Sequence, residues 1–369
     1  MNAPHLYQRN PDLLPEWGED AKLVLLDCRR GRRFAVTPAL LDMLRHLDRP
    51  RTAEDLHIRW VDSPGTGDLD KLLVRLSTAG IVHRCPPGLQ GSAPSASPET
   101  HDDGWTPYEL AVHTQAARGP RPGAQRGDPP PARLRHTEAT GTVSLPDGHG
   151  APSRPLTTVL AARRSIRDFA PRPLPFDGLG ALLDRAARVR GHLPPLTYQQ
   201  TQRPAPSGGA RHSLEIYLLA RDVEALEPGA YHYDPFAHVL HRLAPWSDGL
   251  TDLQHRTVVR AAAMPQPPPA SFYLASYAAR TGWKYRGMAL SLIYRDTGCL
   301  MQTLCLTATD LRLAACPIGS IDAPVSAPFL QPYRDRLVNV GSFALGLPSP
   351  HAPTPPIPSG DGPEDARAV

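Results

Sequence analysis

The sequence lacks any long apolar run. No window reaches about 18 consecutive apolar residues, the length that marks a candidate membrane helix. The N-terminal stretch MNAPHLYQRNPDLLPEWGED also has no apolar core of the kind that a secretory signal requires. We therefore expect a soluble cytoplasmic protein with no role in a membrane.

Excess charge of one sign is missing as well. The formal net charge is only +4, the 40 basic residues are mostly arginines, and no block of them dominates. Proteins that bind nucleic acid usually concentrate basic residues on one face or in one segment. This balance argues against nucleic acid as a partner.

Cysteines are few and are not arranged for metal binding or crosslinking. The five form no CxxC pair and no metal-like set with histidine. An odd number in a chain of this length argues against a disulfide framework, and no metal site is expected. Cys299 and Cys305 fall in an apolar helical run, which predicts buried free thiols. GxGxxG and Walker loops are also lacking, so the usual dinucleotide and nucleotide folds lose support.

Residues 1–84 predict a small winged-helix-like domain. The runs KLVLLD and RRFAVT, with a turn at Gly31 between them, indicate a hairpin. Threonine before proline in TPALLDMLRHL is typical of a helix start, and Thr52 with Asp55 forms a capping-box pattern. A third helix is expected to end at Gly80. The strand IVHR follows, so the order is strand, strand, three helices, strand.

Two segments are too rich in proline, glycine and serine to predict a packed core. Residues 85–155 and 348–369 hold many of the 44 prolines. Such composition cannot bury enough apolar surface to offset the entropy lost on ordering. We expect a linker and a disordered tail, except for GWTPYELAVHTQAA, whose helical spacing predicts a docking helix within the linker.

Residues 156–347 predict a larger α+β domain. LTTVLAA, PFDGLGALLDRAARVRG and the long apolar run from 296 to 312 have helical spacing, and the second of these is expected to end at Gly191. SLEIYLLAR alternates as a strand should, GAYHYDPFAHVLHRL indicates a hairpin, and ASFYLASYAA and RLVNVGSFALG predict further strands. Strands and helices mix without regular alternation, which favours the α+β class.

Four short motifs in this domain could carry chemistry. Guanidinium groups and a hydroxyl can bind phosphate, and glycine-rich turns let backbone N–H groups approach a ligand. Taken alone, the motifs are more typical of a solvated helix end, a plain turn or a surface loop than of a functional site. The residues are Arg163, Arg164, Ser165 and Arg167 in ARRSIRDF; Pro206, Ser207, Gly208 and Gly209 in RPAPSGGARHS; Lys284 and Tyr285 in TGWKYRGMAL; and Ile318 and Gly319 in CPIGS.

Taken in this order, with PGAYHYDP before the Lys-Tyr pair, the motifs resemble the flavin-dependent nitroreductase superfamily. Within it the chain is most similar to the SagB-type azoline dehydrogenases of peptide natural-product biosynthesis. The resemblance covers residues 156–347. Glycines follow Pro206–Ser207 where generic nitroreductases often have asparagine, and the C-terminal ALGLP lacks a basic pair. Both departures favour the SagB-type subgroup.

This resemblance implies FMN bound at a homodimer interface. Arg163, Ser165 and Arg167, with Arg164 as a further candidate, would hold the phosphate and ribityl chain. The loop Pro206–Gly209 would lie along the flavin, and the turn Ile318–Gly319 would direct backbone N–H groups to the reactive edge.

The resemblance also implies that Lys284 and Tyr285 are the catalytic pair. Oxidising a thiazoline or oxazoline to an azole removes one hydrogen as a proton and one as a hydride, which FMN would accept. Lysine is a poor base at its reference pKa of about 10.4, and we expect burial beside Trp283 and the nearby Arg286 cation to lower the pKa of Lys284. The sequence leaves open which of the pair takes the proton.

The implied partners are a modified precursor peptide and a cyclodehydratase, with residues 22–84 as a possible leader-peptide module. Two other functions remain open. One is an NAD(P)H-dependent flavin reductase of dehydroamino acid, nitro or quinone groups. The other is a non-catalytic scaffold in a peptide-modifying complex.

Overall fold

The structure is a computed structural model that describes residues 4–18, 22–61, 63–86, 104–120, 127–194 and 197–350. The chain divides into two compact units, Met1–Pro120 and Arg121–Val369. Most of the tail predicted at 348–369 lies outside the described residues. Within the described ranges, no helix is long and apolar enough to cross a membrane.

The first unit contains the predicted hairpin, three helices and closing strand. The hairpin turns at Gly31, whose φ of +63° favours glycine. Thr52 and Asp55 form the predicted capping box, and Gly80 ends the third helix in a left-handed conformation with φ +85°. Two strands near the N-terminus, β1 and β2, were not predicted. The elements are β1 (Leu6–Arg9), β2 (Leu13–Trp17), β3 (Leu23–Asp27), β4 (Arg32–Ala35), α1 (Pro38–Arg45), α2 (Ala53–Arg59), α3 (Thr66–Ala79) and β5 (Val82–Cys85).

These strands form two small sheets around one core. The order β2-β3-β4 makes an antiparallel sheet, and β1 pairs with β5. Leucines from α1, α2 and α3 pack against Leu25 of β3 on one face. Leu26 and Cys28 instead meet Leu110 of α4 (Pro107–Ala117). The predicted docking helix therefore packs against this unit.

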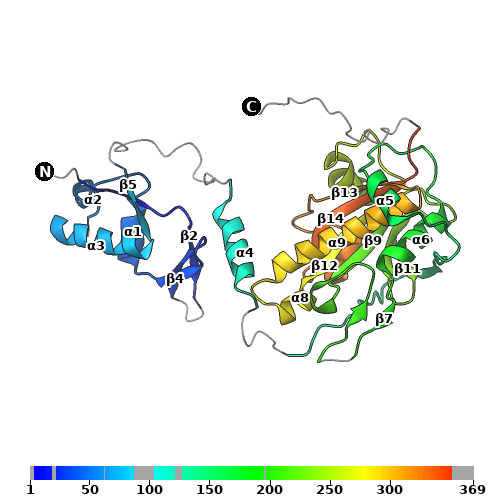
Figure 1. The fold of residues 1–369 in the computed structure, drawn as a ribbon, viewed down its shortest axis with the longest axis horizontal. Coiled ribbons are helices and arrows are strands. Elements are labelled where there is room, and N and C mark those ends of the chain that lie inside the picture. Colours follow the sequence, from blue (N-terminus) through cyan, green and yellow to red (C-terminus); the bar gives the residue numbers. More distant parts are fainter. Residues whose placement is uncertain are drawn as a thin grey trace. The chain divides into compact units, whose positions relative to one another are not determined.

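The second unit is built on a seven-stranded antiparallel sheet in the order β13-β14-β12-β9-β10-β11-β6. All the strands and the hairpin predicted for this unit are present, and the fold is α+β. Figure 1 shows α9 lying across one face of the sheet beside α6. The elements are β6 (Gly141–Ser144), α5 (Leu156–Ala162), α6 (Phe176–Ala187), β7 (Gly191–His192), β8 (Thr201–Gln202), η1 (Gly208–Ala210), β9 (Leu214–Ala220), β10 (Gly229–Asp234), β11 (Val239–Pro245), α7 (Asp248–Gln254), η2 (His255–Arg260), β12 (Ala270–Tyr277), α8 (Ala278–Lys284), α9 (Ala289–Asp310), β13 (Ala314–Ile318), η3 (Pro328–Tyr333) and β14 (Leu337–Gly346).

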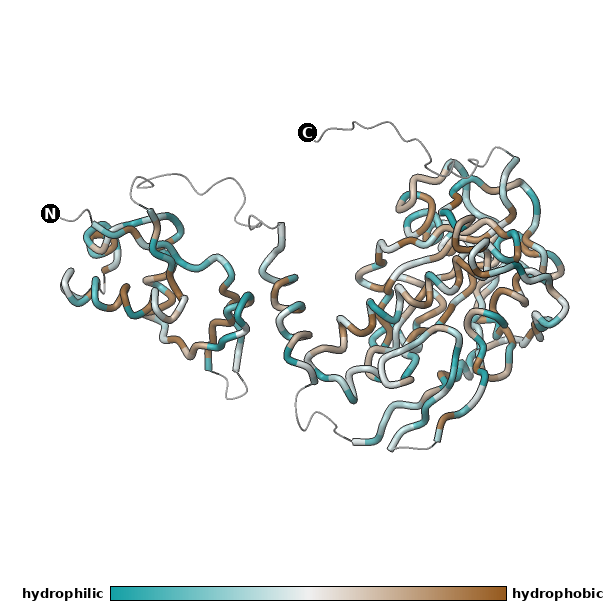
Figure 2. The backbone as a smooth tube through the Cα atoms, viewed as in Figure 1, coloured by the Kyte–Doolittle hydropathy of each residue, from teal (hydrophilic) through white to brown (hydrophobic). Residues whose placement is uncertain are grey.

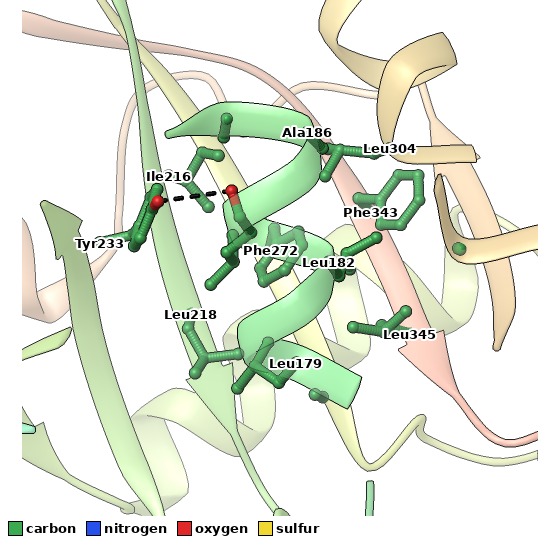
Figure 3. Packing of buried hydrophobic residues seen from close by; sticks show 14 of the residues in the cluster. Leu179, Leu182, Ala186, Ile216, Leu218, Tyr233, Phe272, Leu304, Phe343 and Leu345 are labelled. Carbon is green, nitrogen blue, oxygen red and sulfur yellow. Dashed lines mark hydrogen bonds between the residues drawn. The ribbon is translucent and has the colours of Figure 1, made fainter. Parts of the chain in front are cut away.

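Both faces of this sheet are buried. Ile216 and Leu218 of β9 join a cluster with α6 and α9, whereas Tyr217 and Leu219 join a second cluster with α7 and η3. Figure 3 shows the first cluster, in which α6 packs against β9, β12 and β14, and the Tyr233 hydroxyl donates to the Leu183 carbonyl at 3.4 Å. Hydrophobic segments gather among the central strands and helices (Figure 2). Burial on both faces gives β9 a rigid setting.

Some boundaries differ from the predicted ones. Helix α6 ends at Ala187 instead of Gly191, because Arg188 turns extended and its side chain, like that of Arg190, binds Asp184. Part of the expected linker is also structured. Strand β6 closes the edge of the sheet against β11, and the chain before it is held by side chains of the second unit. Composition alone could not predict this order, because it depends on hydrogen bonds to residues that are distant in sequence.

Candidate functional site

The Lys-Tyr pair lies at the end of a helix rather than in a loop. Lys284 is the last residue of α8 and Tyr285 is its C-cap. Arg280, which is fully buried, anchors this helix by an ion pair of 2.5 Å to Glu215 of β9. Its guanidinium also donates to the carbonyls of Pro131 and His212. A rigid strand therefore fixes the position of the pair.

The pair meets the glycine loop at Gly209. A Cβ atom added to this residue would lie 2.7 Å from the Tyr285 hydroxyl and 3.3 Å from the Lys284 Nζ. Gly209 also has a φ of +63°, which an L side chain rarely adopts. The structure thus brings together two motifs that are far apart in sequence, and only glycine suits the contact.

Helix α9 holds the same loop through Asp296. The Ser207 hydroxyl donates to Asp296 Oδ2 at 2.6 Å, and the Gly208 N–H donates to Oδ1 at 3.1 Å. Burial raises the pKa of Asp296, and these two hydrogen bonds act against the increase. Sequence analysis placed the helix start at this residue, but α9 begins at Ala289 and the buried acid binds a neighbouring loop. An acid within an apolar helical run was the available signal.

The expected fall in the Lys284 pKa is wrong. A hydrogen bond from its Nζ to the Tyr198 hydroxyl, 2.6 Å long, raises the pKa of Lys284 above its usual value, and a further bond to Tyr285 acts in the same direction. Burial lowers it, but with less effect. Lys284 is therefore an ammonium at neutral pH.

Tyr198, which sequence analysis missed, is 5% exposed. Its hydroxyl donates to the Gly209 carbonyl at 3.3 Å, and the Gln200 amide donates to the same carbonyl at 3.0 Å. Its ring also lines an open groove of about 580 Å³ with Pro129–Ala132 and Gln199. A solvent-accessible surface therefore lies next to the residues that hold Lys284.

His212 and Glu215 lie beneath the loop at a cavity of about 40 Å³, large enough for water. His212 Nε2 hydrogen-bonds the Thr201 carbonyl at 2.9 Å, and burial beside Arg203 lowers the pKa of His212 to about 3. Burial raises the pKa of Glu215, but the Arg280 charge and the His232 hydrogen bond outweigh this and bring it to about 2. At neutral pH, His212 is therefore a neutral imidazole and Glu215 is an ionised carboxylate.

The arginine motif follows α5, where the chain becomes extended at Arg163. The Ile166 N–H donates to the Ala315 carbonyl of β13 at 2.8 Å, which sets the motif beside that strand. Burial raises the pKa of the Cys305 thiol to about 11, and the charge of the nearby Arg163 acts against this. Arg167 acts in the same way on Cys316. Arg163 therefore lies near α9 and Arg167 near β13.

Arg164 lies elsewhere. It lines a pocket of about 190 Å³ with Arg154, Ile166 and Arg312. Arg163, Ser165 and Arg167 are not among the residues that line this pocket.

Ile318 and Gly319 stand at the end of β13. The segment predicted as a turn is a strand up to Ile318, which pairs with Ser342 of β14. A Cβ atom added to Gly319 would meet nothing within 4 Å. The turn itself is thus reduced to the residues after the strand, with open space beside Gly319.

The candidate residues form two groups joined by α9. Asp296 holds the glycine loop, which in turn meets the Lys-Tyr pair at Gly209, whereas Cys305 lies near Arg163. Cys305 follows Asp296 by nine positions in the helix, which is about 14 Å along the axis.

This arrangement fits FMN on its donor set. In the described part of the chain, Arg163 and Arg167 form no ion pair. Unpaired guanidiniums beside a serine suit a phosphate. No group of three or more metal-ligating side chains occurs among the same described residues.

Comparison with known proteins identifies relatives of the second unit. A family model described as "Nitroreductase family" matches residues 160–346. A Methanocaldococcus jannaschii protein named as a nitroreductase is 29% identical over 169 residues, which are 45% of this chain and 78% of that protein. The trifolitoxin-processing protein TfxB of Rhizobium leguminosarum bv. trifolii is 31% identical over 91 residues, 24% of each chain.

Solved structures give similar matches. A Ralstonia eutropha JMP134 structure named as a nitroreductase has a TM-score of 0.45 and 20% identity, covering 62% of this chain and 98% of that one. The E. coli microcin synthetase McbBCD complex, solved with truncated pro-MccB17 bound, has a TM-score of 0.39 and 20% identity, covering 58% of this chain and 76% of that one.

Proposed function

The chain belongs to the nitroreductase family, and we propose that it is an FMN-dependent dehydrogenase that oxidises thiazolines or oxazolines in a ribosomally made peptide. The observation that carries this proposal is the contact of Lys284 and Tyr285 with Gly209. A proton-handling pair lies against the loop that would border the flavin. A plain electron-transfer site has no need of such a pair.

Tyr285 is the proton acceptor in this mechanism. Lys284 carries its charge beside the Tyr285 ring, with Nζ 5.1 Å from the ring centroid. An ammonium in this position stabilises the phenolate that accepts a proton from the azoline ring carbon. Lysine is thus the helper and tyrosine is the base. When bound, FMN supplies the acceptor for the hydride from the adjacent ring carbon.

The remaining candidate residues would hold the cofactor. Arg163, Ser165 and Arg167 would bind its phosphate and ribityl chain, because guanidinium and hydroxyl groups donate to phosphate oxygens. Pro206, Ser207, Gly208 and Gly209 would border the ring, fixed by Asp296. Ile318 and Gly319 would present backbone N–H groups next to open space. Arg164, which lines another pocket, is a weaker candidate.

A peptide substrate is supported by the relative that is named for processing trifolitoxin. The first unit suits an extended peptide as well, because β4 is an edge strand that pairs only with β3 among the described strands. A leader peptide could add beside it through backbone hydrogen bonds. We propose a homodimer that acts on a precursor peptide after a cyclodehydratase has formed the rings.

The test is a visible spectrum followed by mass spectrometry. We expect the purified protein to be yellow and to remove two hydrogens from each ring of an azoline-bearing peptide under air. Arg163→Ala should lose FMN, whereas Tyr285→Phe should keep FMN and lose ring oxidation. Full ring oxidation by Tyr285→Phe would contradict the assignment of the base.

A second candidate is reduction of nitro or quinone groups with NAD(P)H. It is favoured by the longer match to the relative named as a nitroreductase. Rapid bleaching of the bound flavin by NAD(P)H in the absence of peptide would support this candidate against the first.

A further inference from the structure

We infer that Tyr198 is a positioning residue that fixes the Lys284 ammonium at the Gly209 loop. Its effect on the reaction rests on the proposed function, whereas its effect on Lys284 does not. The residue stands well upstream of the Lys-Tyr motif, between the strands β7 and β8.

One short contact ties Lys284 to this tyrosine. Its Nζ donates to the Tyr198 hydroxyl at 2.6 Å and lies 5.0 Å from the Tyr198 ring centroid. The ammonium therefore meets the hydroxyl end of the ring and not its π-face. This contact restricts the four-carbon lysine stem, which would otherwise sample several rotamers.

Tyr198 is itself held firmly. The guanidinium of Arg211, a residue only 1% exposed, lies 4.7 Å from its ring centroid, and the Trp283 ring packs edge-on at 5.8 Å. The Gln200 amide approaches the Tyr198 hydroxyl at 3.4 Å. Arg211 also donates from Nε to the Arg280 carbonyl of α8, so it is attached to the helix that carries Lys284.

The direction of the hydrogen bonds decides the role. A tyrosine hydroxyl has one proton, and that of Tyr198 is directed to the Gly209 carbonyl at 3.3 Å. The proton in the much shorter contact must then come from Lys284. Tyr198 thus accepts from Lys284, and this hydrogen bond favours the charged form of the lysine, because it raises the pKa of Lys284. A lysine held as an ammonium leaves Tyr285 to accept the proton.

The composition makes this inference directly measurable. The sequence contains only three lysines, Lys22, Lys71 and Lys284. Labelling the holoprotein with lysine enriched in ¹³C at Cε gives three side-chain signals, and Lys284→Met assigns one by its disappearance. The signal of Lys71, whose side chain is 80% exposed, is an internal reference.

We expect Tyr198→Phe to lower the pH midpoint of the Lys284 signal and to leave FMN content unchanged. For azoline oxidation, kcat should fall by about 10²-fold, the cost of misplacing a reacting group by about 1 Å, and its pH profile should shift in the same direction. The matched control is Tyr231→Phe, which also removes a buried hydroxyl, bonded to the Glu227 carbonyl at 2.6 Å. This control should change neither property.

An unchanged Lys284 midpoint in folded Tyr198→Phe overturns the inference. Should that variant fail to fold, the wild-type protein still tests the inference, because a Lys284 midpoint no higher than that of the exposed Lys71 overturns it. A wild-type protein without ring oxidation refutes the proposed function only, because the Lys284 titration still tests Tyr198.

Discussion

Hydrogen bonds to Tyr198 and Tyr285 keep the pKa of Lys284 above its usual value, so this residue acts by its charge. Lys284→Arg retains a cation that cannot serve as a base near neutral pH. We expect this variant to keep measurable ring oxidation, reduced by about tenfold, whereas Lys284→Met should lose about 10²–10⁴-fold in kcat. Single-turnover kinetics on an azoline peptide check this difference.

FMN absorbance is the control for intact binding in both variants. Equal and complete loss of activity in Lys284→Arg and Lys284→Met, with FMN retained, would instead make lysine the proton acceptor.

His212 and Glu215 predict acid sensitivity. In the folded protein the pKa of His212 is about 3 and that of Glu215 is about 2. The ordinary values, which apply to the unfolded chain, are 6.5 and 4.5. Between its folded and ordinary pKa, each group therefore binds more protons in the unfolded chain than in the folded protein. As a result, the free energy of unfolding falls as the pH is lowered from about 6.5. Each pH unit costs up to about 1.4 kcal/mol per group.

Replacing His212 isolates its part of this effect. His212→Gln cannot titrate but can still donate to the Thr201 carbonyl. We expect urea unfolding between pH 7 and pH 5 to show a smaller loss of stability in this variant than in the wild type. An identical pH dependence would mean that the buried histidine is not responsible, and His46→Gln, at the C-cap of α1, is the control.

How far a site residue can be predicted depends on how local its signal is. Gly209, Lys284 and Tyr285 belong to short motifs whose order in the chain carries information. Tyr198 and Asp296 act through partners remote in sequence, Lys284 and Ser207. The neighbouring sequence does not indicate these contacts, so the roles of Tyr198 and Asp296 become visible only in the fold.

Among the structural elements, the loop of Gly208–Ala210 is sensitive to substitution, because it packs against the Lys-Tyr pair. Gly209→Ala places a Cβ atom 2.7 Å from the Tyr285 hydroxyl at a backbone φ of +63°. We expect a loss of about 1–3 kcal/mol in the free energy of unfolding, together with loss of ring oxidation. Gly191→Ala, where the nearest atom would be 3.7 Å away, is the control. Urea titration of both variants measures the difference. Equal stabilities of the two variants would contradict this prediction.

Periodicity predicted most helices and strands correctly, but it failed where side chains bind across the fold. The predicted helix covered only the apolar run from 296 to 312, whereas α9 begins at Ala289, and the Asp296 carboxylate within it binds the loop at Gly208. The segment of β13 was predicted as a turn, because Pro317 and Gly319 are residues typical of turns. Backbone pairing with β14 overrides that local preference.

The two units have separate hydrophobic cores, one around Leu69 and Leu73 and another around α6 and the large sheet. Separate cores predict two calorimetric unfolding transitions. FMN at about 100 times its dissociation constant should stabilise the second unit by about 2.7 kcal/mol. The transition of residues 1–120 should not move. A single transition that shifts as a whole would mean that the units unfold together.

Helix α9 imposes a constraint on how this chain can vary over evolution. Asp296 binds Ser207 and Cys305 lies near Arg163, and both residues belong to one continuous helix. Each residue of a helix adds about 100° of rotation. A single insertion between them would turn the arginine end away from the catalytic end. Homologues should therefore tolerate length changes in surface loops but not in this segment, and a library of one-residue insertions would show a gap in viable variants between these two positions.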